Sequence, residues 1–218
     1  MVRMVGGKPR PFGDDKKPKG RAALLVAAVV GTAAAGGTAL SAGGGAASVE
    51  SGGGSSLQAR NSGKESARKG KHEDAMKRLG LKTLKKVAKR ELKCAPYAFG
   101  QVQEFFVRHP CKSLSRMLLA VADGGGNTVV VTIAWVRMPK AVDARELRDL
   151  ADRDGSGNIY ALPDALLKQA GVRFTGDHYA SRLDSSLLVI AEATSGGGRP
   201  ADAVLEDAAT VAADFPVP

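Results

Sequence analysis

The chain has 218 residues, and its 32 Lys and Arg side chains outnumber its 22 Asp and Glu side chains, for a formal net charge of +10. This positive excess lies before Cys94, whereas residues 94–218 carry slightly more acidic than basic side chains. A nucleic-acid-binding domain needs a basic face that displaces phosphate counterions, so the region after Cys94 is not expected to bind nucleic acid. That region holds both Cys, the one Trp and all three Tyr, and it is expected to form the folded core.

A stretch without charged side chains, residues 22–49, follows a basic N-terminal tail, residues 1–21. Its apolar part, Ala22–Ala42, predicts a transmembrane helix, because about 20 residues with a rise of about 1.5 Å each span a hydrocarbon core of about 30 Å. The next basic residue is Arg60, so the tail is expected to be cytoplasmic and the chain after the helix extracytoplasmic. A cleaved signal sequence, which would leave a secreted domain, and an Ala/Gly-rich flexible tail are the alternatives.

Residues 43–72 are rich in Gly, Ser, Lys and Glu, which predicts a flexible linker. In residues 73–93 apolar side chains recur at helical spacing among many cations, which predicts a basic helix. This helix is expected to bind anionic lipid headgroups or an acidic envelope polymer, or, more simply, to dock on the domain by its apolar stripe with its charges in water. The cations that would make the anionic contact are Lys77, Lys82, Lys85, Lys86, Lys89 and Arg90.

The two cysteines, Cys94 and Cys111, predict one disulfide, because an even and minimal count in an exported protein favours a bridge. Residues 102–109 have the pattern of a helix that lies between them. The Cα atoms of a bridge lie within about 7 Å of each other, so residues 94–100 must run back alongside this helix.

Two β-hairpins, each followed by a helix, are predicted in the remainder of the chain. Apolar runs mark the strands, and helical spacing of Leu, Val and Ala marks the helices. The predicted strands are Ser115–Ala122, Thr128–Met138, Val172–Leu183 and Ser186–Thr194, and the predicted helices are Val142–Asp152, a brief Pro163–Ala170 and Ala201–Asp214. Two such ββα units predict an α+β fold in which helices pack on an antiparallel four-stranded sheet.

Both faces of the second predicted strand are apolar. One face has Val129, Val131, Ile133 and Trp135, and the other has Val130, Ala134 and Val136. A strand buried on one face only would alternate with polar residues. Either helices therefore cover both faces of the sheet, or the second face binds a ligand or a second copy of the chain in a homodimer.

A polar loop that begins at Asp152 looks like the first part of a calcium-binding EF-hand loop. Oxygen-bearing side chains stand at its alternate positions, which are Asp152, Asp154, Ser156 and Asn158. The twelfth position, where a bidentate Glu closes the ligand shell, is Pro163, so calcium binding is expected to be weak. A polar connection that holds no metal is the simpler interpretation.

His178 lies in a predicted strand, and an exported enzyme with a cleft around this His is an alternative function. A general base needs a nucleophile or substrate proton within hydrogen-bond reach, and nothing in the sequence supplies that geometry, so a structural His is the simpler interpretation. The Gly-rich runs match no phosphate-binding or dinucleotide-binding pattern. Neither a catalytic residue nor a cofactor is predicted.

The region 94–215 resembles a group of uncharacterised actinobacterial proteins. The segments that carry the resemblance are CAPYAFGQVQEFFVRHPCKSLSR, VTIAWVRMP, VRFTGDHYASR and VIAEA. The resemblance implies a short basic N-terminus, one membrane segment and a small exported domain, and it assigns no activity. We therefore expect a membrane-tethered, non-enzymatic binding or interaction module of the cell envelope. An enzyme at His178 is the first alternative, and a weak calcium-binding domain or a nucleic-acid binder is the second.

Overall fold

The computed structural model describes residues 2–5, 8–11, 54–164, 167–168 and 171–218. In the basic tail, β1 (Val2–Val5) and β2 (Lys8–Pro11) form an antiparallel pair. The predicted membrane span, Ala22–Ala42, lies outside the described residues. Within the described ranges, no helix has both the length and the apolar character that crossing a membrane requires.

The main sheet has five antiparallel strands in the order β3-β4-β5-β7-β6, so it has one strand more than the sequence predicts. Its strands are β3 (Lys82–Glu91), β4 (Ser113–Ala122), β5 (Thr128–Arg137), β6 (Tyr179–Asp184) and β7 (Leu187–Gly197). The two predicted hairpins, β4–β5 and β6–β7, are present and are joined by the pairing of β5 with β7. The α+β class is therefore confirmed, and β3 is the added edge strand.

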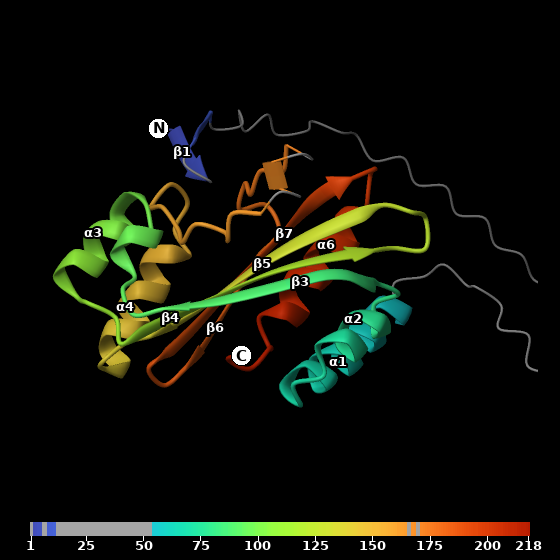
Figure 1. The fold of residues 1–218 in the computed structure, drawn as a ribbon, viewed down its shortest axis with the longest axis horizontal. Helices are drawn as coiled ribbons and strands as arrows, with labels where there is room; N and C mark the ends of the chain where they lie inside the picture. The colour runs from blue at the N-terminus through green and yellow to red at the C-terminus, as the bar shows by residue number, and fades with distance from the viewer. Residues whose placement is uncertain (1, 6–7, 12–53, 165–166, 169–170) are drawn as a thin grey trace, which may run out of the picture. The chain divides into compact units, whose positions relative to one another are not determined.

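The helices flank this sheet (Figure 1). They are α1 (Gly54–Arg68), α2 (His72–Arg78), the short 3-10 helix η1 (Ala95–Tyr97), α3 (Gly100–Arg108), α4 (Ala141–Ala151) and α6 (Asp202–Ala212). Helices α4 and α6 follow the two hairpins, as predicted. Part of the predicted brief helix Pro163–Ala170 lies outside the described residues, which include a helical Leu167 and Lys168.

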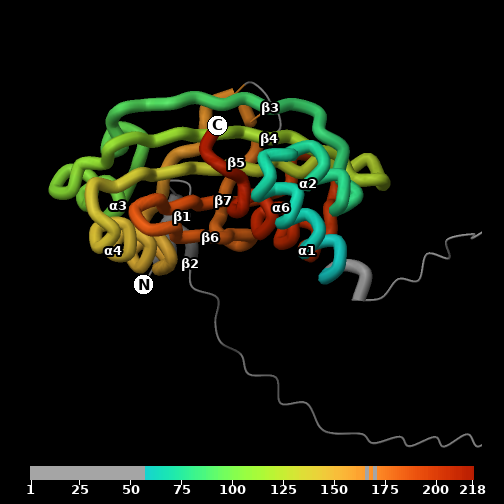
Figure 2. Tube along the Cα trace, turned by 90° about the horizontal axis from the view of Figure 1, so that it is seen from below, coloured from blue at the N-terminus to red at the C-terminus, as the bar shows by residue number. Residues whose placement is uncertain are grey.

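Both faces of the central strand β5 are covered by the chain itself. On one face Val131, Ile133 and Trp135 pack in a core with α1, α2 and α6. On the other face Ala134 and Val136 pack with α3 and α4. Figure 2 shows α3 and α4 toward one end of the strands and α1 and α2 toward the other. The sequence leaves two alternatives for the second face, which are coverage by helices or contact with a ligand or a second copy. The structure shows coverage by the chain's own elements.

The predicted basic helix over residues 73–93 is wrong beyond Arg78. Helix α2 ends there, and Gly80 adopts a φ of 73°, a left-handed conformation that favours Gly and turns the chain. The chain then pairs with β4, from Lys82 opposite Ala122 to Glu91 opposite Leu114. The helical spacing of the apolar residues is a local pattern and does not indicate pairing with a distant strand. The backbone hydrogen bonds to β4 outweigh this local preference.

The predicted flexible linker is also wrong where it overlaps α1. This helix has few large apolar side chains, and it docks through small residues, with Gly63, Ser66 and Ala67 buried. A Cβ atom on Gly63 would lie 3.2 Å from the Val211 side chain of α6 and 3.3 Å from the carbonyl oxygen of Ala75. The small residues of α1 therefore let its backbone pack closely against α2 and α6. This packing, rather than the burial of large apolar side chains, holds α1 on the domain.

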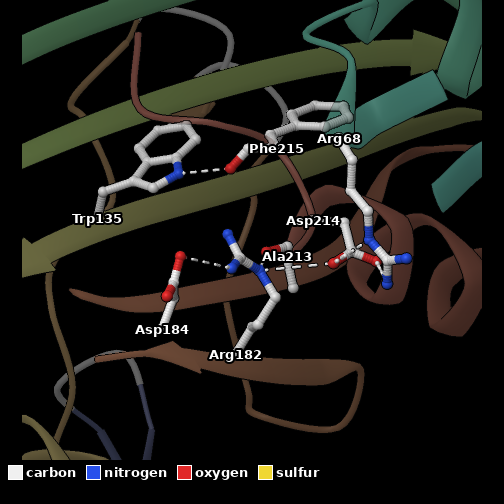
Figure 3. A network of polar contacts seen from close by, with 7 residues as sticks. All are labelled: Arg68, Trp135, Arg182, Asp184, Ala213, Asp214 and Phe215. Atoms are coloured by element: carbon white, nitrogen blue, oxygen red, sulfur yellow. Dashed lines mark hydrogen bonds and ion pairs between the residues drawn. The ribbon is translucent and has the colours of Figure 1, made fainter. Parts of the chain in front are cut away.

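Charged groups fasten α1 to the C-terminal end of the domain (Figure 3). Arg68 of α1 donates from Nε to Asp214 Oδ1 and from its terminal nitrogen to Oδ2, both at 3.3 Å. Arg182 of β6 donates from Nε to the Ala213 carbonyl at 2.9 Å and lies 3.5 Å from Asp214 Oδ1. Asp214 is only 5% exposed, so two guanidinium groups compensate a buried carboxylate.

The disulfide between Cys94 and Cys111 is confirmed, with Cα atoms 6.0 Å apart. The η1 turn reverses the chain directly after Cys94, and α3 then leads to Cys111. Both sulfurs belong to the packed region that α3 and α4 form on the sheet. The bridge therefore ties the start of η1 to the residues that precede β4.

Candidate functional site

A cavity of about 590 Å³ lies where the edge strand β3 meets the segment that follows α4. Its size falls within the range of about 300–1,000 Å³ that is typical of small-molecule sites. The lining residues are Val87, Ala88, Lys89, Tyr97, Arg116, Tyr160, Ala161, Leu162 and Pro163. Apolar and aromatic side chains therefore form most of the wall, and two cations, Lys89 and Arg116, are the charged residues.

Arg116 is the buried polar residue of this cavity, with 3% of its surface exposed. It donates to Glu91 Oε1 of β3 at 2.8 Å and to the carbonyl oxygen of Tyr160 at 2.8 Å. Its guanidinium carbon lies 4.4 Å from the centre of the Tyr97 ring, which is a cation–π arrangement. One side chain on β4 thus joins β3, η1 and the segment at residue 160 around the cavity.

The charges at the cavity do not cancel. Glu91 Oε1 accepts from Arg116 and also lies 3.9 Å from Lys89 Nζ, so two cations share one carboxylate. Arg116 Nε and Glu91 Oε2 are buried and have no hydrogen-bond partner among the described residues. Both atoms are enclosed by protein, so the excess of cations over carboxylates is what favours a ligand with an acidic group here.

Of the six cations predicted to bind an anionic partner, Lys77 lies on α2 and the other five lie on the edge strand β3. All six are exposed. Lys85 is compensated, since its Nζ lies 2.7 Å and 2.8 Å from the two carboxylate oxygens of Asp164. Two large apolar side chains, Leu84 and Leu92, are 54% and 76% exposed among these cations. The edge of the sheet therefore combines positive charge with protruding leucines.

A second cavity, of about 550 Å³, lies at the turn between α2 and β3. Lys77 and Lys82 of the predicted set line it, together with the acidic Glu73. The hydroxyl of Thr83 also lines this region and is buried without a described partner. The charged side chains of this cavity are all exposed to solvent, which weakens their attraction for an anion compared with the buried Arg116.

The four residues of the predicted calcium loop are held by contacts within the protein. Asp152 accepts from the Tyr179 hydroxyl at 2.9 Å and from the Ser181 hydroxyl at 3.2 Å. Ser156 donates to the Leu150 carbonyl at 2.6 Å, and the Asn158 side chain accepts from the backbone N–H of the next residue at 2.8 Å. Asp154 also has an interaction within the protein. Across the described ranges, no cluster of three His, Cys, Asp or Glu side chains is placed to hold a metal ion.

This loop has a structural role, because it accepts hydrogen bonds from backbone N–H groups at the N-terminus of α3. The carbonyl oxygens of Asn158 and Ser156 accept from the backbone N–H groups of Phe99, at 3.0 Å, and Val102, at 3.3 Å. These bonds replace the side-chain cap that α3 lacks. Gly157 has a φ of 103°, and a Cβ there would overlap the Phe99 carbonyl, so the Gly permits the contact.

His178 lies just before β6 rather than within a long strand. Its ring nitrogens are 3.7 Å from Asp202 and 4.0 Å from Glu206 of α6, so it faces two carboxylates. Neither described cavity is lined by His178. Burial raises the pKa of the neighbouring Tyr179 hydroxyl far above its usual range, and the charge of Asp152 raises it further. Tyr179 is therefore a poor acid or base at neutral pH.

Sequence reasoning missed the cavity at Arg116 because its walls come from four separated parts of the chain. The available signal was one arginine, Arg116, within the apolar run of a predicted strand, which usually indicates a buried partner of opposite charge. Comparison of the chain with protein-family models, curated proteins and solved structures gives no match in any of the three.

Proposed function

We propose that this chain is a membrane-tethered, extracytoplasmic and non-enzymatic binding module that docks on an anionic lipid surface through the β3 edge. The observation that carries the proposal is the row of exposed cations on β3 with Leu84 and Leu92 among them. Cations near an anionic leaflet contribute about 1 kcal/mol each, and exposed apolar side chains insert between headgroups. A soluble acidic polymer would use the cations but would leave the leucines in water.

The shape of β3 supports this docking. Ten residues in a strand, at about 3.3 Å each, present an edge roughly 33 Å long. Because β3 is an edge strand, its charges also prevent another strand from pairing there, which is a common property of lysine-rich edges. The charges therefore suit a surface contact more than the addition of a peptide strand.

The chain length before α1 also favours the membrane as the partner. If Ala22–Ala42 spans the bilayer, only residues 43–53 separate its end from α1. Eleven residues reach at most about 40 Å when fully extended. The domain would then stay within reach of the outer leaflet, where tethering raises the effective concentration of a weak lipid site.

The disulfide supports export, since cysteine bridges persist in oxidising compartments and are rare in the cytosol. Topology can be tested with two fusions to the C-terminus, one of alkaline phosphatase and one of a green fluorescent protein. We expect an active phosphatase and a dark fluorescent protein. A bright fluorescent fusion with an inactive phosphatase would place the domain in the cytosol and overturn export.

Lipid docking can be tested by lysine footprinting of the full chain reconstituted in vesicles. We expect an amine-reactive reagent to modify Lys82 and Lys86 at least about fivefold more slowly in phosphatidylglycerol vesicles than in phosphatidylcholine vesicles. Lys140, which is exposed at the start of α4, is an internal control whose rate should not change. High salt should remove the protection. Equal rates in both vesicles contradict lipid docking, and protection by soluble polyphosphate alone would assign the edge to an acidic polymer.

A further inference from the structure

We propose that the cavity between β3 and residues 160–163 is a binding site for a small organic anion, in which a carboxylate or phosphate is attached to an apolar body. The site differs from the surface contact proposed above, because it is a cavity within the domain. It requires neither a membrane nor export. The inference rests on the composition of the walls and on the excess of positive charge.

The walls select the body of the ligand. Val87, Leu162 and Pro163 give aliphatic surface, and Tyr97 and Tyr160 give aromatic surface. Removing an apolar group from water against such walls is favourable in proportion to the area covered. A fully hydrophilic anion such as inorganic phosphate would gain nothing from this part of the cavity.

The cations select the charge of the ligand. Arg116 and Lys89 share the single carboxylate of Glu91, so one positive charge is left over at the cavity. Arg116 lines the cavity and is held in place by Glu91 and by the Tyr160 carbonyl. A cation that is already positioned attracts an anionic group with little loss of side-chain freedom. Lys89 is exposed and therefore lies where a ligand would enter.

The edge strand offers a matched pair of variants. Successive side chains of a strand point to its two faces in turn. Lys89 belongs to the face of β3 that lines the cavity, and Lys86 belongs to the opposite face. Both side chains are exposed, so Lys89→Gln and Lys86→Gln remove the same charge from the same strand at little cost in stability. Ala161→Trp places a large side chain on the wall of the cavity and tests the location.

The probes are 6-fluoro-2-naphthoate and its neutral amide, 6-fluoro-2-naphthamide, which share one apolar body. Binding to the full chain in phosphatidylcholine nanodiscs is followed by fluorine NMR line broadening, with empty nanodiscs as the blank. We expect saturable binding of the naphthoate, at least about fivefold tighter than that of the amide, because a charged acceptor strengthens the bond to Arg116. Lys89→Gln should weaken naphthoate binding about two- to fivefold and leave the amide unchanged. Lys86→Gln should change neither, and Ala161→Trp should abolish both.

Three outcomes would overturn the proposal: equal affinity for the two probes, no saturable binding of the naphthoate, or naphthoate binding that survives Ala161→Trp. Unfolding temperatures of the three variants, measured in the same nanodiscs, show that each has kept its fold. The outcome of this test does not depend on the outcome of the footprinting test. Loss of lipid protection leaves the cavity proposal intact, and absence of naphthoate binding leaves lipid docking intact.

Discussion

The two ends of the domain are fastened by different kinds of bond. Near α3 the disulfide between Cys94 and Cys111 is covalent and depends on redox conditions. Near α1 the carboxylate of Asp214 holds Arg68 and Arg182 through ion pairs and hydrogen bonds, which depend on charge and salt. We therefore expect that α1 and α3 can be released independently, although both pack on one sheet. The predictions below test this independence, from the largest expected effect to the smallest.

Removal of the disulfide should have the largest effect. In the double variant Cys94→Ala, Cys111→Ala, we expect the free energy of unfolding to fall by about 3 kcal/mol, since the unfolded chain is no longer constrained by a loop with a sequence separation of 17. Amide hydrogen exchange should become faster in α3 and stay slow in α1. Faster exchange in both helices would show that the two ends are coupled.

Gly157→Ala should release the same end without touching the disulfide. The residue adopts a φ of 103°, and the new Cβ would overlap the Phe99 carbonyl oxygen. We expect a loss of at least about 2 kcal/mol, because the left-handed conformation and the overlap both act against Ala. Chemical unfolding followed by the fluorescence of the single Trp measures the loss. Gly124→Ala is the control, since a Cβ at Gly124 meets no atom within 4 Å.

Asp214→Asn should release the other end. The carboxylate is buried, but Arg68 remains largely exposed, with 67% of its side chain accessible, so we expect a loss of only about 1–2 kcal/mol. Hydrogen exchange should become faster in α1 and stay slow in α3. Asp184→Asn removes an exposed carboxylate 3.8 Å from the same Arg182 and should change the stability by less than about 0.5 kcal/mol. A larger effect at Asp184 than at Asp214 would contradict the role of the buried carboxylate.

A pH dependence confined to the α1 end is the smallest predicted effect. His72 packs edge-on against Phe215, with ring centres 4.5 Å apart, and its pKa is lowered by burial and by the charge of Lys86. The unfolded chain takes up the proton at a higher pH than the folded chain. Stability that is fully present above the unfolded pKa of about 6.5 is therefore lost as the pH falls through the lower pKa of the folded state.

Unfolding of the wild type and of His72→Leu at pH 8 and pH 5 measures this contribution. We expect the wild type to lose more stability than the variant on acidification, because the lowered pKa of His72 makes the folded state take up its proton less readily than the unfolded chain. Lys86→Gln should reduce the difference, since it removes one cause of the lowered pKa. An acid loss that is identical in the wild type and His72→Leu would exclude His72 as its source.

The hairpins and the helices that follow them could be predicted because their signals are local. In β5 seven of the positions from Val129 to Val136 are apolar, and a strand of that kind is buried whatever it pairs with. The bridge between Cys94 and Cys111 was also predictable, because the count allows one pairing. In each case the signal lies in a short stretch of the sequence or in a simple count of residues.

The edge strand, α1 and the cavity could not be predicted because their causes are long-range. In β3 the spacing of Leu84, Val87 and Ala88 fits a helix, and only the partner strand β4 makes it extended. Helix α1 docks by Gly63 and other small residues that carry no hydropathy signal. The cavity needs β3, β4, η1 and residues 160–163 together, and no local pattern brings them together.

The position of Cys94 directly after β3 determines how the domain would respond to a mechanical pull on the chain that precedes α1. Such a force would detach α1 and α2 and would then open the β3–β4 pairing one residue pair at a time, starting from Lys82. Unzipping would stop at the disulfide, which passes the load to Cys111 and β4, and α3 would carry none. The bridge thus limits stretching to the residues before Cys94 and leaves the two ββα units folded.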